Sequence, residues 1–346
     1  MTPNITWKQI LTKLIAHQEL EPFEVAWAMD QMMEGETPEG ILAAFLIGLH
    51  VKGETSAELN ALAEGMLDKA RPIEITHKAV DIVGTGGDQQ NTVNISTMAS
   101  LVVAGSGIPV IKHGNRASSS MSGSADVLSE LGINLDLKIK DVAGALDSAG
   151  ITFLFAQVFH PSMRYLAPVR RALGVPCAFN YLGPMTNPAK VRSSAIGVSN
   201  QAMAQKMAQV FANRGNHALI FRGGDGLDEI TITGKSYGFE AVDGGVKPLE
   251  IDPTEFGFKL GRLEDLRGGD AKYNAQVVRE TLGGHPGPIL DAVILNAAAG
   301  IVAFHKVDDQ PFSQRFEAAL EQARESIGSG KATDTLDRWI SYSQAQ

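Results

Sequence analysis

Apolar residues recur at three- or four-residue spacing over residues 6–70 of the chain. In the first of four such segments, Ile10, Leu11 and Leu14 fall on one face, which is the pattern of an amphipathic helix. No run typical of a strand occurs in this region. The pattern therefore predicts a small domain of four α-helices over residues 1–72.

Helix start signals accompany this periodicity. Thr6 and Gln9 have the spacing of a capping box, in which two side chains bind the free N–H groups of the first turn. Thr55 and Glu58 have the same spacing ahead of the fourth helix. Thr37-Pro38 has the pattern of an N-cap followed by a first-turn proline, so we expect it to begin the third helix.

Short apolar runs alternate with helical segments in the rest of the chain. This alternation predicts an α/β domain over residues 73–346, with a central, mainly parallel sheet flanked by helices. Ile230–Thr233 and Phe239–Val242 instead alternate in the manner of antiparallel edge strands. The remaining predicted strands are Val80–Val83, Pro109–Ile111, Ile151–Phe155, Ala195–Val198 and Ala218–Arg222, and the predicted helices are Thr97–Ala104, Ala125–Leu131, Asp141–Ser148, Pro161–Leu173, Gln201–Asn213, Val293–Ala303 and two at the C-terminal end.

Composition narrows the class of protein. The 346 residues are 44% hydrophobic and carry a formal net charge of −9, which fits a globular protein and argues against a general nucleic-acid binder. A single cysteine, Cys177, fits a reducing compartment. The longest apolar run, Ile41–Leu49, is far shorter than the roughly 20 residues of a membrane helix, and no secretory signal is visible. We therefore expect a cytoplasmic protein.

The first of two polar loops, Gly84–Asp88, follows the apolar run Val80–Val83. Its glycines allow a sharp turn and a close approach to a ligand, and the free N–H groups of a following helix favour phosphates. Hydroxyl and amide side chains are dense over Thr92–Thr97, with a helix cap as the alternative role for Ser96 or Thr97. The loop matches neither the lysine-containing nucleotide loop nor the dinucleotide fingerprint.

The second polar loop, Lys112–Arg116, follows Pro109–Ile111 and leads into a serine-rich stretch over residues 118–124. Two cations, an imidazole and several hydroxyls favour an anion-binding loop, with a solvated polar loop as the alternative. The role of His113 stays open between a neutral hydrogen-bonding group, a base and a structural histidine. Together the two loops predict a site for a phosphorylated substrate.

Asp228-Glu229 and Arg170 add two further kinds of chemistry. The adjacent carboxylates follow the apolar run Ala218–Arg222, and such oxygens suit Mg²⁺, which keeps waters and phosphate oxygens as its other ligands. A charged turn is the alternative. The Arg170 guanidinium suits bidentate binding of a carboxylate, or it lies on a helix surface.

In combination these motifs resemble the anthranilate phosphoribosyltransferase family of the tryptophan pathway, over essentially the full length of the chain. Their number and common order argue against a chance match. Beyond the helical start, the resemblance rests on Asp81-x-x-Gly-Thr-Gly-Gly-Asp88, Asn94-Ile-Ser-Thr97, Lys112–Arg116, Gly123-Ser-Ala-Asp126, Pro168-Val-Arg170, Asn180-x-Leu-Gly-Pro184, Asn187-Pro-Ala189, Gly226-Leu-Asp-Glu229, Asp252-Pro253, Gly268-Gly-Asp-Ala271 and Leu295-Asn-Ala-Ala-Ala299.

The resemblance implies transfer of a 5-phosphoribosyl group from phosphoribosyl pyrophosphate to the amine of anthranilate, with Mg²⁺ as cofactor. It implies no single catalytic acid or base, and Lys112, His113 and Asn115 would position the substrates. Anthranilate would contact Gly84, Asn115 and Arg170, and Mg²⁺ would contact Ser96, Asp228 and Glu229. Phosphoribosyl pyrophosphate would contact Gly84, Gly87, Asp88, Thr92, Asn94, Ile95, Ser96, Thr97, Lys112, His113, Gly114, Asn115, Arg116, Ala117, Ser118, Ser119, Ser120 and Ser124.

The resemblance also implies how domains and subunits are arranged. Residues near 170–190 would return to the helical domain, the active site would lie at the hinge, and a homodimer would form through the helical domain. Two departures stand out: Gln89 replaces a usual glycine, and Arg222-Gly223-Gly224 replaces a Val-His-type stretch. A pyrimidine nucleoside phosphorylase and a non-catalytic nucleic-acid-binding relative are the alternatives, whereas the main interpretation involves neither nucleic acid nor membrane.

Overall fold

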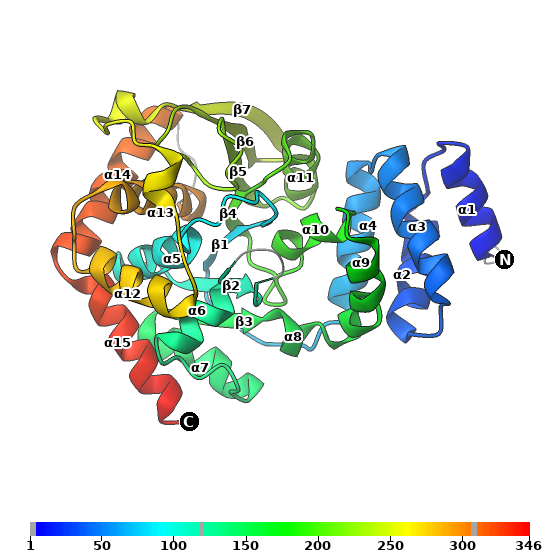
Figure 1. Cartoon of the computed structure of the whole chain (residues 1–346), viewed down its shortest axis with the longest axis horizontal. Coiled ribbons are helices and arrows are strands. Elements are labelled where there is room, and N and C mark those ends of the chain that lie inside the picture. The colour runs from blue at the N-terminus through cyan, green and yellow to red at the C-terminus, as the bar shows by residue number, and fades with distance from the viewer. Residues whose placement is uncertain (1–4, 118–120, 306–309) are drawn as a thin grey trace.

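The N-terminal helices lie at one end of the molecule, and the sheet lies within the larger remainder, whose far end is formed by C-terminal helices (Figure 1). The computed structural model describes residues 5–117, 121–305 and 310–346. The number and order of helices before the first strand confirm the prediction for this region. They are α1 (Trp7–Ile15), α2 (Pro22–Glu34), α3 (Glu39–Lys52) and α4 (Ser56–Asp68).

Both capping boxes predicted from the sequence are present. The Thr6 hydroxyl accepts from the N–H of Gln9 at 3.4 Å, and the Thr55 hydroxyl accepts from the N–H of Glu58 at 3.1 Å. The prediction for Thr37 was wrong by one residue, because α3 has Pro38 as its N-cap. The Thr37 hydroxyl instead donates to a carbonyl near the end of α2, so this side chain is not available to cap α3.

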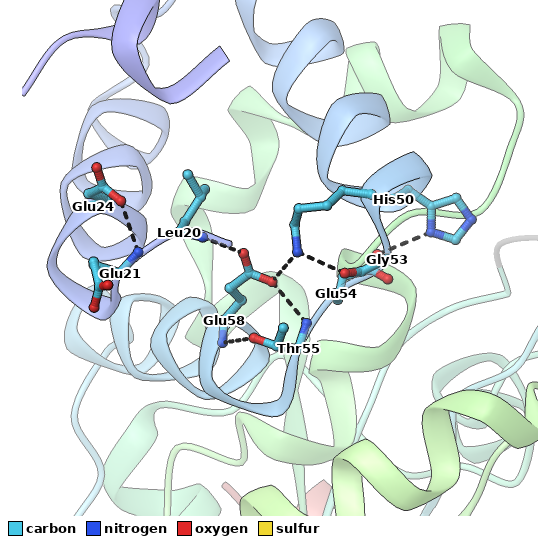
Figure 2. A network of polar contacts seen from close by, with 9 residues as sticks. Leu20, Glu21, Glu24, His50, Gly53, Glu54, Thr55 and Glu58 are labelled. Carbon is cyan, nitrogen blue, oxygen red and sulfur yellow. Dashed lines mark hydrogen bonds and ion pairs between the residues drawn. The ribbon is translucent and has the colours of Figure 1, made fainter. Parts of the chain in front are cut away.

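A buried polar cluster joins the helices at the α3–α4 turn (Figure 2). The Glu58 carboxylate accepts from the N–H of Leu20 at 2.9 Å, from the N–H of Thr55 at 2.8 Å and from Lys52 Nζ at 2.8 Å. The side chains of Lys52 and Glu58 are 3% and 0% exposed. Because donors meet both carboxylate oxygens, the buried charge is compensated, and the turn before α2 is held against the end of α3 and the start of α4.

Seven strands form one sheet in the order β3-β2-β1-β4-β5-β6-β7. The first five in this order run parallel to one another, whereas β6 is antiparallel to β5 and β7 is antiparallel to β6. The order reverses between β1 and β4, where ligands of such sheets bind beyond the carboxyl ends of the strands. The strands are β1 (Val80–Gly84), β2 (Val110–Gly114), β3 (Ile151–Phe155), β4 (Ser193–Gly197), β5 (His217–Gly223), β6 (Ser236–Val242) and β7 (Gly245–Ile251).

Helices cover both faces of this sheet. Alternate residues of a strand point to opposite faces. Leu219 and Phe221 pack in the core with α13 (Pro288–Phe304), whereas Ala218 and Ile220 pack in the core with α11 (Gln201–Asn213). The fold class predicted from the sequence is confirmed. The helices are α5 (Ile95–Gly105), α6 (Ser124–Glu130), α7 (Ile139–Ala149), α8 (Ala156–Phe159), α9 (Ala167–Leu173), α10 (Phe179–Leu182), α11 (Gln201–Asn213), α12 (Ala271–Leu282), α13 (Pro288–Phe304), α14 (Phe312–Gly328) and α15 (Lys331–Gln344).

Two predicted elements were wrong. Ile230–Thr233 is not a strand, because the Thr231 and Thr233 hydroxyls both donate to the Asp225 carboxylate and fold this stretch into a loop. The predicted helix Pro161–Leu173 divides into a 3₁₀ turn and α9, since the proline in the first turn of α9 has no N–H to continue a helix. Strand β7 and helix α12 were not predicted.

The segment around α9 and α10 lies between the sheet and the N-terminal helices (Figure 1). Leu166, Val169, Phe179 and Leu182 belong to the same buried cluster as the cores of α1–α4 and of α11. This cluster reaches the sheet through side chains of β4 and β5. A continuous apolar core therefore connects the helical part of the chain to one face of the sheet.

Candidate functional site

Asp228 packs against glycines at the carboxyl ends of β1 and β4. A Cβ on Gly84 would overlap the Asp228 carboxylate, and a Cβ on Gly197 would overlap the Asp228 carbonyl. Beyond Gly84, Gly86 and Gly87 have φ of 69° and 82°, a left-handed conformation that glycine adopts without steric cost. Glycine at these positions therefore allows the Asp228-Glu229 segment to lie directly against the first polar loop.

Hydrogen bonds connect the two carboxylates to that loop and its helix. The N–H of Gly86 donates to Asp228 Oδ2 at 2.6 Å. The N–H of Ser96 donates to Glu229 Oε1 at 3.1 Å. Residues far apart in sequence thus meet where the strand order reverses.

Lys112 is buried beside this pair of carboxylates. Its ammonium donates to the Ser96 hydroxyl at 3.2 Å and to the Ile82 carbonyl. Burial lowers the pKa of Lys112, whereas the charges of Asp81, Glu229 and Asp228 raise it. Burial is the larger effect, so the pKa of Lys112 lies below its ordinary value although acidic groups surround the amine.

Burial and acidic neighbours oppose ionisation of both carboxylates. Burial, followed by the charge of Asp88, raises the pKa of Asp228 to about 7. Burial and the charge of Asp228 also raise the pKa of Glu229, against the effect of Lys112. A cation at this position would relieve the repulsion.

Ser96 and Thr97 do not cap α5, which was one alternative for this stretch. The helix begins at Ile95 with Asn94 as its N-cap. The Asn94 amide donates to the Ser122 carbonyl at 3.0 Å and accepts from Asn274 at 2.9 Å. Asn94 therefore links the start of α5 to the segment after β2 and to α12, while Thr92 bridges to Arg267.

His113 lies at the end of β2 with its backbone N–H bound to the buried Asp81 carboxylate at 3.1 Å. Its Nδ1 lies 2.9 Å from the Gly183 carbonyl, so Nδ1 carries the proton and Nε2 is the acceptor. Burial, followed by the neighbouring His160, lowers the pKa of His113 to about 3. The imidazole is therefore neutral at neutral pH, and so low a pKa argues against a role as a base.

Asp126 closes the second polar loop. Its carboxylate accepts from the Arg116 guanidinium at 2.9 Å, from the N–H of Ala117 at 2.8 Å and from the N–H of Gly123 at 3.0 Å. In the sequence, Asp126 is part of the Gly123-Ser-Ala-Asp126 motif, which by itself predicts no role for its side chain. Its position three residues after a glycine, at the start of a helix, was the available signal.

Other residues predicted for the site make separate contacts or none. The Ser124 hydroxyl donates to the Asn115 carbonyl at 3.3 Å, and Gly114 ends β2. Arg170 is a half-buried residue of α9, and no hydrogen bond or ion pair of its side chain occurs within the described residues. Ser118, Ser119 and Ser120 lie outside the described residues.

The donor set fits Mg²⁺ with few protein ligands. No group of three or more histidine, cysteine or acidic residues arranged to hold a metal occurs in the described part of the chain. Mg²⁺ does not require one, since it is held by one or two carboxylates together with substrate phosphates and waters. The adjacent Asp228 and Glu229, with their raised pKa values, are suitable carboxylates.

Two surface clefts lie outside this constellation. One is formed by Ser148 and residues of α15, and the other by α11 and the β5–β7 edge of the sheet. None of the predicted site residues lines either cleft. Over the described residues, no helix combines the length and apolar character that a membrane crossing requires.

The fold and the site define a glycosyl transferase with two parts. Residues 8–70 match the helical bundle domain of the glycosyl transferase family, and residues 76–333 match its a/b domain. The anthranilate phosphoribosyltransferase of Arthrobacter sp. (strain FB24) is 52% identical over 339 residues, 98% of this chain and 96% of the relative. That of Thermobifida fusca (strain YX) is 46% identical over 341 residues, 99% of this chain and 98% of the relative. The chain belongs to the anthranilate phosphoribosyltransferase family.

Solved structures agree with this assignment. The anthranilate phosphoribosyltransferase of Thermus thermophilus is 38% identical, with a TM-score of 0.90 over 97% of this chain and 99% of that chain. The Saccharomyces cerevisiae enzyme in complex with PRPP and Mg is 26% identical, with a TM-score of 0.87 over 98% of both chains. The same yeast enzyme has also been solved with 4-fluoroanthranilate.

Proposed function

We propose that this chain transfers the 5-phosphoribosyl group from phosphoribosyl pyrophosphate to the amine of anthranilate, forming N-(5-phosphoribosyl)anthranilate and pyrophosphate in tryptophan biosynthesis. One observation carries the proposal: the glycine loop, the buried Lys112 and the Asp228-Glu229 pair meet where the strand order reverses. Family membership and the yeast complexes with PRPP and with 4-fluoroanthranilate support it.

The first loop and the start of α5 would hold the pyrophosphate and ribose. Backbone N–H groups of Gly87 and Asp88, with hydroxyls of Thr92, Ser96 and Thr97, suit phosphate oxygens. Lys112 would oppose the negative charge that develops on the leaving pyrophosphate. The proposed donor contacts also include the other first-loop and second-loop residues named for this role above.

Mg²⁺ is part of this proposal, with Ser96, Asp228 and Glu229 as its protein contacts. When bound, it would supply positive charge to the pyrophosphate oxygens. The Mg-containing yeast complex supports this cofactor.

Anthranilate would be oriented by Gly84, Asn115 and Arg170. The Arg170 guanidinium has no partner in the described residues and suits the anthranilate carboxylate. An aryl amine carries a free lone pair, so no strong base is needed before attack, and the neutral His113 is compatible with this. Catalysis would then rest on holding two substrates in contact and excluding water.

Fluorescence tests the proposed reaction directly. The anthranilate signal should decrease when the protein, phosphoribosyl pyrophosphate and Mg²⁺ are all present, and it should persist when any one is omitted. If the signal persists in the complete mixture while thymidine and phosphate yield free base, the phosphorylase alternative replaces the proposal. A salt-dependent gel shift on DNA or RNA would support the nucleic-acid-binding alternative.

Domain division and subunit state are further parts of the proposal. We place the boundary between residues 72 and 73, which the family matches to residues 8–70 and 76–333 support. A homodimer through the helical domain is supported by exposed apolar side chains there, with Ile15, Phe23 and Val51 exposed by 80%, 51% and 67%. Sedimentation equilibrium should give twice the chain mass of 36.9 kDa. A monomer would contradict this part alone.

A further inference from the structure

The Gly86 peptide is held from both sides. Its N–H donates to Asp228 Oδ2 at 2.6 Å, and its carbonyl accepts from the Ser199 hydroxyl at 2.9 Å. Gly86 itself is exposed and has a left-handed φ of 69°. Ser199 and Asp228, from the loops after β4 and β5, therefore hold an exposed glycine whose carbonyl also accepts from the adjacent Thr85 hydroxyl at 3.1 Å.

Ser199 makes this contact from the loop between β4 and α11. Its N–H donates to the Thr85 hydroxyl at 3.1 Å, and the two hydroxyl oxygens lie 3.4 Å apart. The N–H of Thr85 in turn donates to the Gly197 carbonyl at 2.9 Å. These contacts extend the pairing of β1 and β4 beyond the strand ends and into the glycine loop.

Arg222 holds Ser199 in place. Its Nε donates to the Ser199 carbonyl at 2.9 Å, and its Nη1 donates to the Gly223 carbonyl at 3.3 Å. A Cβ on Gly226 would lie 3.3 Å from Nη2, so the guanidinium also packs against the turn that leads to Asp228. One side chain thus joins the Ser199 loop to the segment that carries the carboxylate pair.

We propose that Ser199, held by Arg222, is a positioning residue that keeps the glycine loop in its phosphate-binding conformation. This inference rests on the proposed function. A glycine-rich loop loses much conformational entropy when it becomes ordered. A loop that is already ordered before the substrate arrives avoids that cost at binding. Neither side chain is assigned contact with the reacting atoms, so both act through the loop.

Ser199→Ala is the direct test, with steady-state rates measured by anthranilate fluorescence. It removes the Ser199 bond to the Gly86 carbonyl and leaves the bond from the Thr85 hydroxyl. Loss of one hydrogen bond of this kind corresponds to about a fivefold change. We expect the KM for phosphoribosyl pyrophosphate to rise about fivefold, with the KM for anthranilate and kcat within about twofold. Ser199→Thr keeps the hydroxyl and should restore the donor KM. Ser106→Ala is the matched control, because the Ser106 hydroxyl also donates to a backbone carbonyl but lies at the far end of α5.

Arg222→Met tests whether Arg222 acts through Ser199. It should raise the donor KM by a similar factor, and the double variant should be no worse than the stronger single variant, because coupled residues are not additive. Additive effects would overturn the role of Arg222.

The proposal for Ser199 has its own refuting results. An unchanged donor KM in Ser199→Ala, equal rises for both substrates, failure of Ser199→Thr to restore the KM, or loss of folding would each overturn it. A parent protein with no anthranilate consumption would instead refute the proposed function, so the two failures are distinguishable.

Discussion

Neutralising the two adjacent carboxylates should separate activity from stability. The double variant Asp228→Asn with Glu229→Gln keeps the shape of both side chains, and the Asn oxygen still accepts from the N–H of Gly86. If the pair holds Mg²⁺ at the pyrophosphate, the Mg²⁺-dependent rate should fall by about 100-fold or more. Turnover indistinguishable from that of the parent would refute the magnesium assignment.

The same variant should be at least as stable as the parent, although its activity falls. The pKa of Asp228 rises from 3.8 to about 7, which at 1.36 kcal/mol per unit sets a ceiling of about 4 kcal/mol for the cost of its charge. Asp228 is partly exposed, so solvent screening reduces this to about 1–2 kcal/mol. Urea unfolding in EDTA should therefore show a stability equal to or above that of the parent.

A matched control distinguishes loss of the proposed metal site from a general loss of acidic charge. Asp337→Asn removes one carboxylate from α15, where the side chain is 60% exposed, and should leave both the rate and the urea midpoint unchanged. If the double variant is instead destabilised by more than about 2 kcal/mol, the argument from buried charge fails.

Three further predictions address other parts of the chain. Arg170→Ala should raise the KM for anthranilate about tenfold and leave the donor KM nearly unchanged, because a charge-assisted carboxylate contact is lost; the reverse pattern in fluorescence kinetics would move Arg170 to the donor site. Gln89 has a φ of 61°, which strains a residue other than glycine. In Gln89→Gly the relief of about 1 kcal/mol of strain and the greater flexibility of the unfolded glycine should nearly cancel in the free energy of unfolding. A change of more than about 1 kcal/mol in urea unfolding would contradict this. Burial opposes ionisation of Glu240, but hydrogen bonds from His217 and Arg315 hold its pKa at about 2, below the ordinary 4.5. The ionised Glu240 side chain therefore stabilises the folded protein above pH 4.5, and this stabilisation is lost as the pH falls toward 2. At pH 7, Glu240→Gln should be less stable than the parent by about 2 kcal/mol, a figure that already includes a reduction for solvent screening. The difference in stability should become smaller below pH 4.5. A difference that does not change with pH would refute the ionic contribution of Glu240.

Elements with a local signal were predictable from the sequence. The four N-terminal helices follow from apolar periodicity and two capping boxes, and the five parallel strands follow from short apolar runs. The prediction failed where distant partners override the local pattern. Ile230–Thr233 has the alternation of a strand, yet its hydroxyls bind Asp225 and hold it as a loop.

The sequence by itself determined which chemical groups the site contains. The glycine loop, Lys112 and the Asp228-Glu229 pair each come after a short apolar run, and that position is visible in the chain. The structure extends the second of these runs into β2, which includes Lys112. The family resemblance identified Gln89 in place of a usual glycine, and its φ of 61° gives the physical reason why glycine suits this position.

Only the tertiary structure decided how these groups contact one another. The strand order brings β1 beside β4, although more than one hundred residues separate them, so no local pattern predicts that Asp228 binds Gly86 or that Ser199 binds its carbonyl. The same holds for His113, whose neutral state depends on burial and on the Gly183 carbonyl. Burial and contacts between distant residues are properties of the folded chain, because they depend on how separate elements pack and not on the local sequence around any one of them.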